Sequence, residues 1–98
     1  MKLGKPKPQS CPVAVVAELL SDVWTMRIIH TLLPIKHMRF CEIERALPGI
    51  STRTLTLKLK RLEEDGILAK DERGYAMTAI GKKLKPVIAA MEKFGKCL

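Results

Sequence analysis

The chain has 98 residues, which is enough for one folded domain and too few for several. Hydrophobic residues make up 47% of it, so an intrinsically disordered chain is excluded. The formal net charge of +8 indicates a polyanionic partner, with nucleic acid ahead of a membrane surface.

Other classes of protein are disfavoured by what the sequence lacks. No apolar run approaches the roughly 18 residues of a membrane-spanning helix, and the N-terminal residues MKLGKPKPQ contain no apolar signal core. The cysteines Cys11, Cys41 and Cys97 are odd in number and widely spaced, which fits a reducing compartment rather than a disulfide framework. We therefore expect a cytoplasmic protein that does not contact a membrane.

The sequence shows no pattern typical of a metal site, a cofactor site or an enzyme active site. The cysteines and the histidines His30 and His37 show no spacing typical of zinc ligands. The sequence contains no phosphate-binding glycine loop and no pair of residues suited to act as nucleophile and base. We expect no metal, no cofactor and no enzymatic activity, and we expect His30 to be a packed or half-exposed residue.

Residues 1–10 form a basic, proline-interrupted segment without an acid. We expect a flexible, solvated arm, although an arm that touches phosphate would have the same composition. Residues 11–98 then form a single domain. Its first helix begins with Pro12, which suits a first turn, and continues with apolar residues at helical spacing as far as Leu20.

The central helix of this domain is expected over residues 23–33. Asp22 is a suitable N-cap for it, and Pro34 ends it. Its apolar residues form a broad surface: Trp24, Ile28, Ile29, Leu32 and Leu33. Residues 35–38 follow as a connector with room for a very short strand.

The next helix is expected over residues 39–47. Three apolar side chains step by three and four residues and predict one buried stripe: Phe40, Ile43 and Leu47. Cys41 is expected at the edge of the core as a small apolar residue. Pro48 and Gly49 then force a tight turn.

A second helix is expected over residues 52–65, with Ser51 as its N-cap and Gly66 as the residue that ends it. Its inner side is a stripe of leucines: Leu55, Leu59 and Leu62. At about 100° per residue the outer side collects Arg53, Thr56, Leu57, Lys60, Arg61 and Glu64. Three acids crowd its C-terminal end, which is unfavourable for the helix dipole; one explanation is that this end points away from a polyanion while the basic N-terminal part approaches it.

A β-hairpin is expected from strand-like segments at residues 67–70 and 75–78, around a turn that ends at Gly74. From Thr78 the helical pattern returns to the C-terminus, and Pro86 is expected to bend that helix. Its apolar stripe is Ile80, Leu84, Val87, Ile88, Met91 and Phe94. Pairing with a second copy best explains this stripe; folding back on its own domain or lying on a membrane are the alternatives.

Several motifs together are typical of one family. They are Cys11-Pro12-Val13, Trp24, Arg39-Phe40 with Glu42-Ile43, Ala46-Leu47-Pro48-Gly49-Ile50-Ser51, Leu55-Thr56, Leu59, Leu62-Glu63, Asp65-Gly66, Tyr75, Thr78, Gly81, Leu84 and Pro86. On these motifs the chain resembles the HxlR-type winged helix-turn-helix transcription regulators over nearly all of residues 11–95. It departs from them at Ser21-Asp22-Val23, in its short hairpin turn, and at Leu57, a position that is often polar in the family.

The resemblance implies a mainly α-helical winged helix-turn-helix that dimerises through its N- and C-terminal helices and binds double-stranded DNA. The candidate DNA contacts are Arg39, Ser51, Thr52, Arg53, Thr56, Leu57, Lys58, Lys60, Arg61 and Arg73. Arg53 suits a guanine, and Thr56 or Leu57 suits a thymine methyl group. The start of the second helix suits a phosphate, and most of the other basic residues would neutralise phosphates. An ordinary solvated basic face is the alternative.

Members of this family can use the cysteine at the position of Cys11 to sense oxidants or reactive carbonyl compounds. A thiol at a helix N-terminus close to basic residues gains thiolate character, so Cys11 is a candidate sensor, and an inert thiol is the alternative. The expected function is a dimeric, sequence-specific transcription regulator that acts as a repressor, open to redox or electrophile control. A basic architectural or RNA-binding protein without a fixed operator is one alternative, and an adaptor for protein contacts is another.

Overall fold

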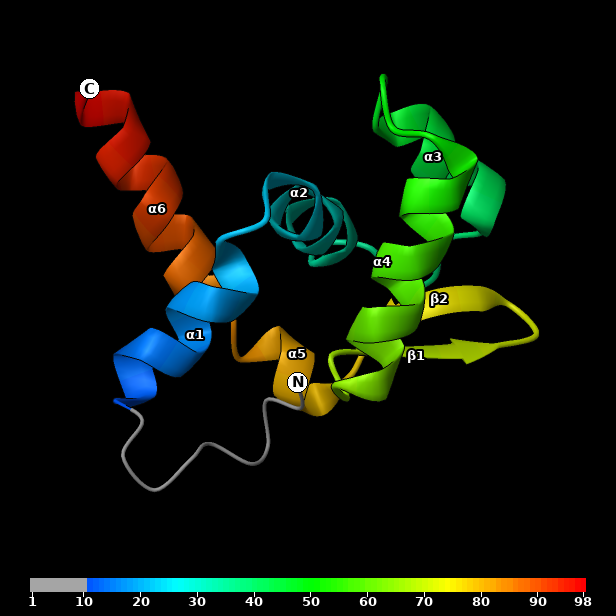
Figure 1. Ribbon diagram of the computed structural model, residues 1–98, viewed down its shortest axis with the longest axis horizontal. Helices are drawn as coiled ribbons and strands as arrows, with labels where there is room; N and C mark the ends of the chain where they lie inside the picture. Colours follow the sequence, from blue (N-terminus) through cyan, green and yellow to red (C-terminus); the bar gives the residue numbers. More distant parts are fainter. Residues whose placement is uncertain (1–10) are drawn as a thin grey trace.

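The computed structural model describes residues 11–98, and the expected arm at residues 1–10 lies outside the described residues. The described chain forms six helices and one two-stranded sheet (Figure 1). In chain order the elements are α1 (Pro12–Leu20), α2 (Val23–Leu32), α3 (Phe40–Ala46), α4 (Thr52–Glu64), β1 (Leu68–Asp71), β2 (Gly74–Met77), α5 (Ala79–Lys82) and α6 (Lys85–Cys97).

Helix α2 lies at the centre of the core, as its broad apolar surface predicts. The side chains of Ile28, Ile29 and Leu32 are fully buried. The predicted leucine stripe of α4 is also fully buried: Leu55, Leu59 and Leu62. Burial of one leucine stabilises a fold by about 1.5–3 kcal/mol, so this stripe strongly determines which side of α4 faces inward.

The hairpin is antiparallel, with its register running from Leu68 opposite Met77 to Asp71 opposite Gly74. Gly74 has φ +118°, in the region that favours glycine. The connector contributes a single bridge to this hairpin, because the Met38 amide donates to the Tyr75 carbonyl at 2.9 Å and the Tyr75 amide donates to the Met38 carbonyl at 2.8 Å. The expected short strand in the connector is therefore this one bridge.

The helix ends of the central region follow the predicted capping pattern. The Asp22 carboxylate accepts from the Thr25 amide at 3.1 Å, and the Ser51 hydroxyl accepts from the Thr54 amide at 3.0 Å. Gly66 follows α4 with φ +79°, which matches its predicted role after the helix.

The expectation of one C-terminal helix bent at Pro86 is wrong. The segment forms two helices, α5 and α6, and Pro86 lies in the first turn of α6, where a missing amide costs no helical hydrogen bond. The Thr78 hydroxyl caps α5 by accepting from the Gly81 amide at 3.0 Å, and it donates to the Gly66 carbonyl at 2.6 Å. This bond ties the start of α5 to the end of α4.

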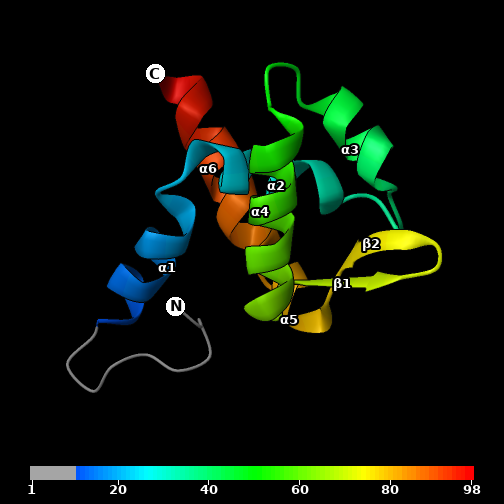
Figure 2. The same cartoon turned by 45° about the vertical axis from the view of Figure 1, so that its right-hand side comes forward.

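Two helices keep apolar faces that their own domain does not cover. Helix α1 has no buried residue, and Val13 is 75% exposed. Of the C-terminal apolar stripe only Ile88 is buried, and Phe94 is 66% exposed. Both helices lie on the side of the molecule opposite the hairpin turn (Figures 1 and 2).

The arrangement is a winged helix-turn-helix, in which α3 and α4 form the helix-turn-helix and the hairpin is the wing. No helix among residues 11–98 combines the length and the apolar composition needed to cross a membrane.

Candidate DNA-binding surface

Helix α4 presents a continuous exposed face on the side away from its buried leucines. This face contains the predicted contact residues Arg53, Thr56, Leu57, Lys60 and Arg61. Leu57 is 55% exposed in spite of its apolar side chain. The face therefore offers guanidinium and ammonium donors beside one exposed hydrophobic group, which are the groups that recognise guanine edges and thymine methyl groups.

The start of α4 is held by hydroxyl groups. Ser51 caps the helix through Thr54, and the Thr52 hydroxyl donates to a Glu44 carboxylate oxygen on α3. The Thr56 hydroxyl donates to the Thr52 carbonyl at 2.8 Å. These bonds orient the first turn, whose positive dipole end faces outward as expected of a phosphate-binding helix start.

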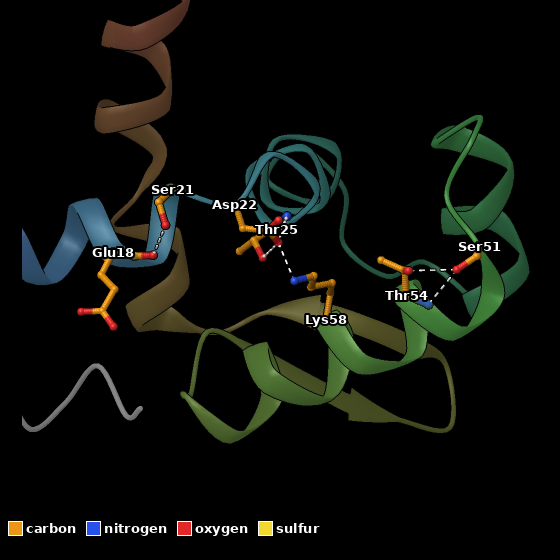
Figure 3. A network of polar contacts seen from close by, with 7 residues as sticks. All are labelled: Glu18, Ser21, Asp22, Thr25, Ser51, Thr54 and Lys58. Carbon is orange, nitrogen blue, oxygen red and sulfur yellow. Dashed lines mark hydrogen bonds and ion pairs between the residues drawn. The ribbon is translucent and has the colours of Figure 1, made fainter.

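Lys58 occupies a different environment from the other predicted DNA contacts. Its ammonium nitrogen lies 3.0 Å from the Asp22 Oδ2 atom at the start of α2 (Figure 3). Partial burial acts to raise the pKa of Asp22, but the hydrogen bonds from Thr25 and Lys58 together outweigh burial and hold this pKa below its ordinary value of 3.8. Lys58 was predicted to contact a phosphate, but in the structure its ammonium group pairs with Asp22 of the same protein.

The other two predicted basic contacts lie outside α4. Arg39 precedes α3 and is exposed, and its backbone amide donates to Glu42 Oε1 at 2.8 Å. Arg73 lies in the turn of the hairpin, which projects beyond α4 (Figures 1 and 2). The Arg73 guanidinium lies 3.4 Å from the Asp71 carboxylate, and the backbone amide of Arg73 donates to the same carboxylate at 2.7 Å.

Asp71 therefore faces the wing arginine directly. The hydrogen bond from the Arg73 amide is the main cause that holds the pKa of Asp71 below its ordinary value, and the Arg73 charge acts in the same direction. His37 of the connector also lies 3.6 Å from Asp71. The wing thus carries an acid that competes with phosphate for Arg73.

Cys11 is the N-cap residue of α1 and is exposed, as the sensor hypothesis requires. Cys97 is also exposed. The expectation that Cys41 lies at the edge of the core is wrong: it is exposed, because Ile43 and Leu47 already direct the buried side of α3 inward.

His30 is exposed and lies 3.3 Å from Glu92 of α6. In residues 11–98 no group of three or more metal-ligating side chains comes together.

Three acidic residues of this surface were not expected from the sequence to act there: Asp22, Glu44 and Asp71. From the sequence, Asp22 was expected only as the N-cap of α2. Its second partner, Lys58, lies on α4. A signal for Asp71 was available, because Asp in front of a short turn often accepts from the amide two residues on. The partners of Asp22 and Glu44 depend on packing and have no local signal.

This fold and surface define a winged helix-turn-helix DNA-binding protein. The sequence pattern described as HxlR-like helix-turn-helix matches residues 19–98. The chain is 37% identical over 92 residues to the HTH-type transcriptional regulator sll1512 of Synechocystis sp., covering 87% of this chain and 67% of that protein. It is 30% identical to YybR of Bacillus subtilis, covering 93% of this chain and 78% of that protein.

Among solved structures, quinone-bound YodB from B. subtilis is similar with a TM-score of 0.83 and 31% identity, covering 90% of this chain and 100% of that chain. The chain belongs to the HxlR-like helix-turn-helix family. It is a DNA-binding transcription regulator of the helix-turn-helix type.

Proposed function

We propose that this regulator acts as a homodimeric, sequence-specific repressor in the cytoplasm. The observation that carries the proposal is the exposed face of α4, where Arg53 and Lys60 flank the exposed Leu57. A solvated basic face has no reason to expose a leucine at its centre, whereas a base-reading face does, because thymine presents a methyl group in the major groove.

The residues of this face divide into base contacts and phosphate contacts. We assign Arg53 to a guanine edge, Thr56 and Leu57 to a thymine methyl group, and Lys60 to a further base edge. Phosphate contacts fall to Arg39, Arg61 and Arg73, and to the backbone amides at the start of α4 around Ser51 and Thr52, whose hydroxyl groups are bonded within the protein. Because phosphate neutralisation releases counterions, affinity should fall steeply with salt.

The dimer is supported by the uncovered faces of α1 and α6. Val13 and Val16 on α1, and Val87, Met91 and Phe94 on α6, are all exposed. A second copy would bury these side chains and present a second α4. The two recognition helices would then read half-sites about one DNA turn apart, and a dimer on such a site would exclude RNA polymerase from an overlapping promoter.

Regulation by electrophiles is supported by Cys11 and by one structural relative. The thiol of Cys11 is exposed at the start of α1, one of the two helices assigned to the dimer, and YodB, a similar structure, is a quinone-bound protein. The thiolate of Cys11 would add to an electrophilic carbon and place a bulky group beside the dimer helices. Cys11→Ser should abolish the loss of operator binding that a quinone causes, and Cys41→Ser and Cys97→Ser should leave it intact.

Sequence specificity is tested by crosslinking the regulator to DNA in cells and mapping the bound sites. Purified protein is then bound to one mapped site in competition with unrelated duplex DNA and with RNA. The proposal predicts that only DNA with the mapped sequence competes efficiently. Equal competition by every duplex, or stronger competition by RNA, would show a basic architectural or RNA-binding protein instead.

A further inference from the structure

Lys58 differs in direction from the cations that surround it on α4. At about 100° per residue, Lys58 lies about 60° from the centre of the buried leucine stripe, whereas Lys60 lies about 140° from it on the other flank. The side chain of Lys58 is accordingly only 35% exposed. The stem of Lys58 therefore runs toward the body of the protein.

The carboxylate that receives Lys58 is itself held in place. Its Oδ2 atom accepts from the Thr25 amide at 3.1 Å, from the Thr25 hydroxyl at 2.6 Å, and from the Lys58 ammonium at 3.0 Å (Figure 3). Thr25 is buried, and both residues belong to the first turn of α2, the central helix of the core. Asp22 is thus a fixed point on a rigid element.

The ion pair between Asp22 and Lys58 spans two helices along a groove of about 520 Å³. The groove is lined by Glu18, Leu19, Asp22, Thr25, Leu57, Lys58, Lys60, Arg61, Leu62, Glu64 and Asp65. Its walls are the junction of α1 with α2 on one side and the C-terminal part of α4 on the other. Of the buried leucine stripe, only Leu62 lines this groove. The ion pair is a direct link across it.

A second polar contact holds the other end of α4. The Thr52 hydroxyl donates to Glu44 of α3, one turn before the leucine stripe begins. Together, Glu44 at the start and Asp22 near the middle give α4 two anchors on two different helices. The leucine stripe sets the rotation of α4 about its axis, and these two anchors restrict it further, so they affect where Arg53 and Lys60 point.

We propose that Lys58 is a positioning residue rather than a phosphate contact: through Asp22 it holds α4 in the rotation that directs its exposed face toward DNA. This inference rests on the proposed function, recognition of an operator by α4. Its consequence is that the charge of Lys58 acts inside the protein and adds nothing to the counterions released on DNA binding.

The test uses the full chain and a mapped operator, with affinity measured over a range of salt concentrations. The variants are Lys58→Met, Asp22→Asn and the double variant, with Arg61→Met as the control for loss of a phosphate contact. Asparagine is a good N-cap, so Asp22→Asn removes the charge and leaves α2 capped. Circular dichroism of each variant verifies its helix content at the assay temperature.

The proposal predicts that Lys58→Met and Asp22→Asn each weaken operator binding by a factor of about 2 to 5, the range of a partly exposed ion pair. The double variant should be no weaker than either single variant, because both remove one interaction. The slope of log affinity against log salt should stay at its native value in Lys58→Met and fall by about 0.9 in Arg61→Met. Lys58→Arg should bind the operator with native affinity, because arginine keeps the ion pair with Asp22.

The opposite pattern would overturn the inference. If Lys58 contacts phosphate, Lys58→Met lowers the salt slope as Arg61→Met does, and Asp22→Asn tightens binding because it releases Lys58. If Lys58→Met folds poorly, Asp22→Asn decides alone: weaker operator binding supports the positioning role of Lys58, and tighter binding refutes it. A native chain without any sequence preference would instead refute the proposed function, and this inference would fall with it.

Discussion

A methyl group at position 74 would lie 2.6 Å from the carbonyl oxygen of Met38, because the backbones of Gly74 and Met38 meet where the connector joins the hairpin. Gly74 also has a positive φ that L side chains rarely adopt. We expect Gly74→Ala to destabilise the fold by about 2 kcal/mol or more, since the two costs add. Urea unfolding followed by circular dichroism measures this loss.

Gly95 provides the matched control for Gly74. It lies in α6, and a Cβ there would meet nothing within 4 Å. Gly95→Ala should leave stability unchanged or raise it by up to about 1 kcal/mol, because alanine favours a helix over glycine. Equal losses in the two variants would refute the role of the close approach to Met38.

Asp22 makes stability depend on pH in a defined direction. Its pKa is lower in the folded chain than its ordinary value of 3.8. Its ionisation therefore stabilises the fold fully above that value, and the contribution is lost as pH falls through the folded pKa. We expect Asp22→Asn to be less stable than the native chain at pH 6 and to lose less stability between pH 6 and pH 3. The difference should be small because solvent screens a partly exposed pair.

Urea midpoints at the two pH values test this expectation. Glu63→Gln on the exposed end of α4 is a suitable control for a change of one charge. An Asp22→Asn variant whose stability falls with acid as steeply as that of the native chain would show that Asp22 does not carry the effect.

The wing arginine should bind DNA more strongly once its acidic neighbour is removed. Asp71 holds the Arg73 guanidinium at 3.4 Å, and Asp71→Asn keeps an acceptor for the Arg73 amide while removing the charge. We expect tighter operator binding in Asp71→Asn, by a few-fold, measured by fluorescence anisotropy. Glu72→Gln removes a neighbouring acid outside this pair and should give a smaller gain. Equal gains would mean that only the net charge of the wing matters.

The dimer should depend on the apolar stripe of α6. Phe94→Lys places a charge on this stripe, and we expect it to shift the chain to monomers and to weaken operator binding by at least tenfold, because one half-site is then bound at a time. Analytical ultracentrifugation gives the mass. Ala89→Lys introduces the same charge about 140° away from Phe94 around α6 and should leave a dimer. Monomers in the native chain at all concentrations would contradict the proposed pairing.

The helix-turn-helix could be predicted from the sequence because local signals agree along it. The leucine stripe of α4 has one helical period, Ser51 is a cap that acts within its own turn, and Gly66 ends the helix. Each signal acts over a few residues, so packing did not have to be known. The same stripe assigned the exposed face, which is why Leu57 was expected outside.

The features that escaped prediction depend on contacts between distant segments. The ion pair between Asp22 and Lys58 joins residues on two helices, and the sequence around either residue does not predict the other as its partner. Helix α5 ends at Lys82 and α6 begins at Lys85, with Pro86 in the first turn of α6, while the apolar pattern runs on without interruption. Periodicity shows which face of a helix is apolar, and it does not show where one helix stops when the next continues the pattern.

The central claim is that the exposed face of α4 reads DNA sequence, and the specificity ratio of Arg53→Ala tests it most directly. This ratio compares the Kd for unrelated duplex with the Kd for a mapped operator at one salt concentration. The native ratio should be about a thousandfold or more. Arg53→Ala should lower it by about tenfold or more, the value of a lost guanine contact, while Arg61→Ala weakens both duplexes alike. An unchanged ratio in Arg53→Ala would contradict the claim.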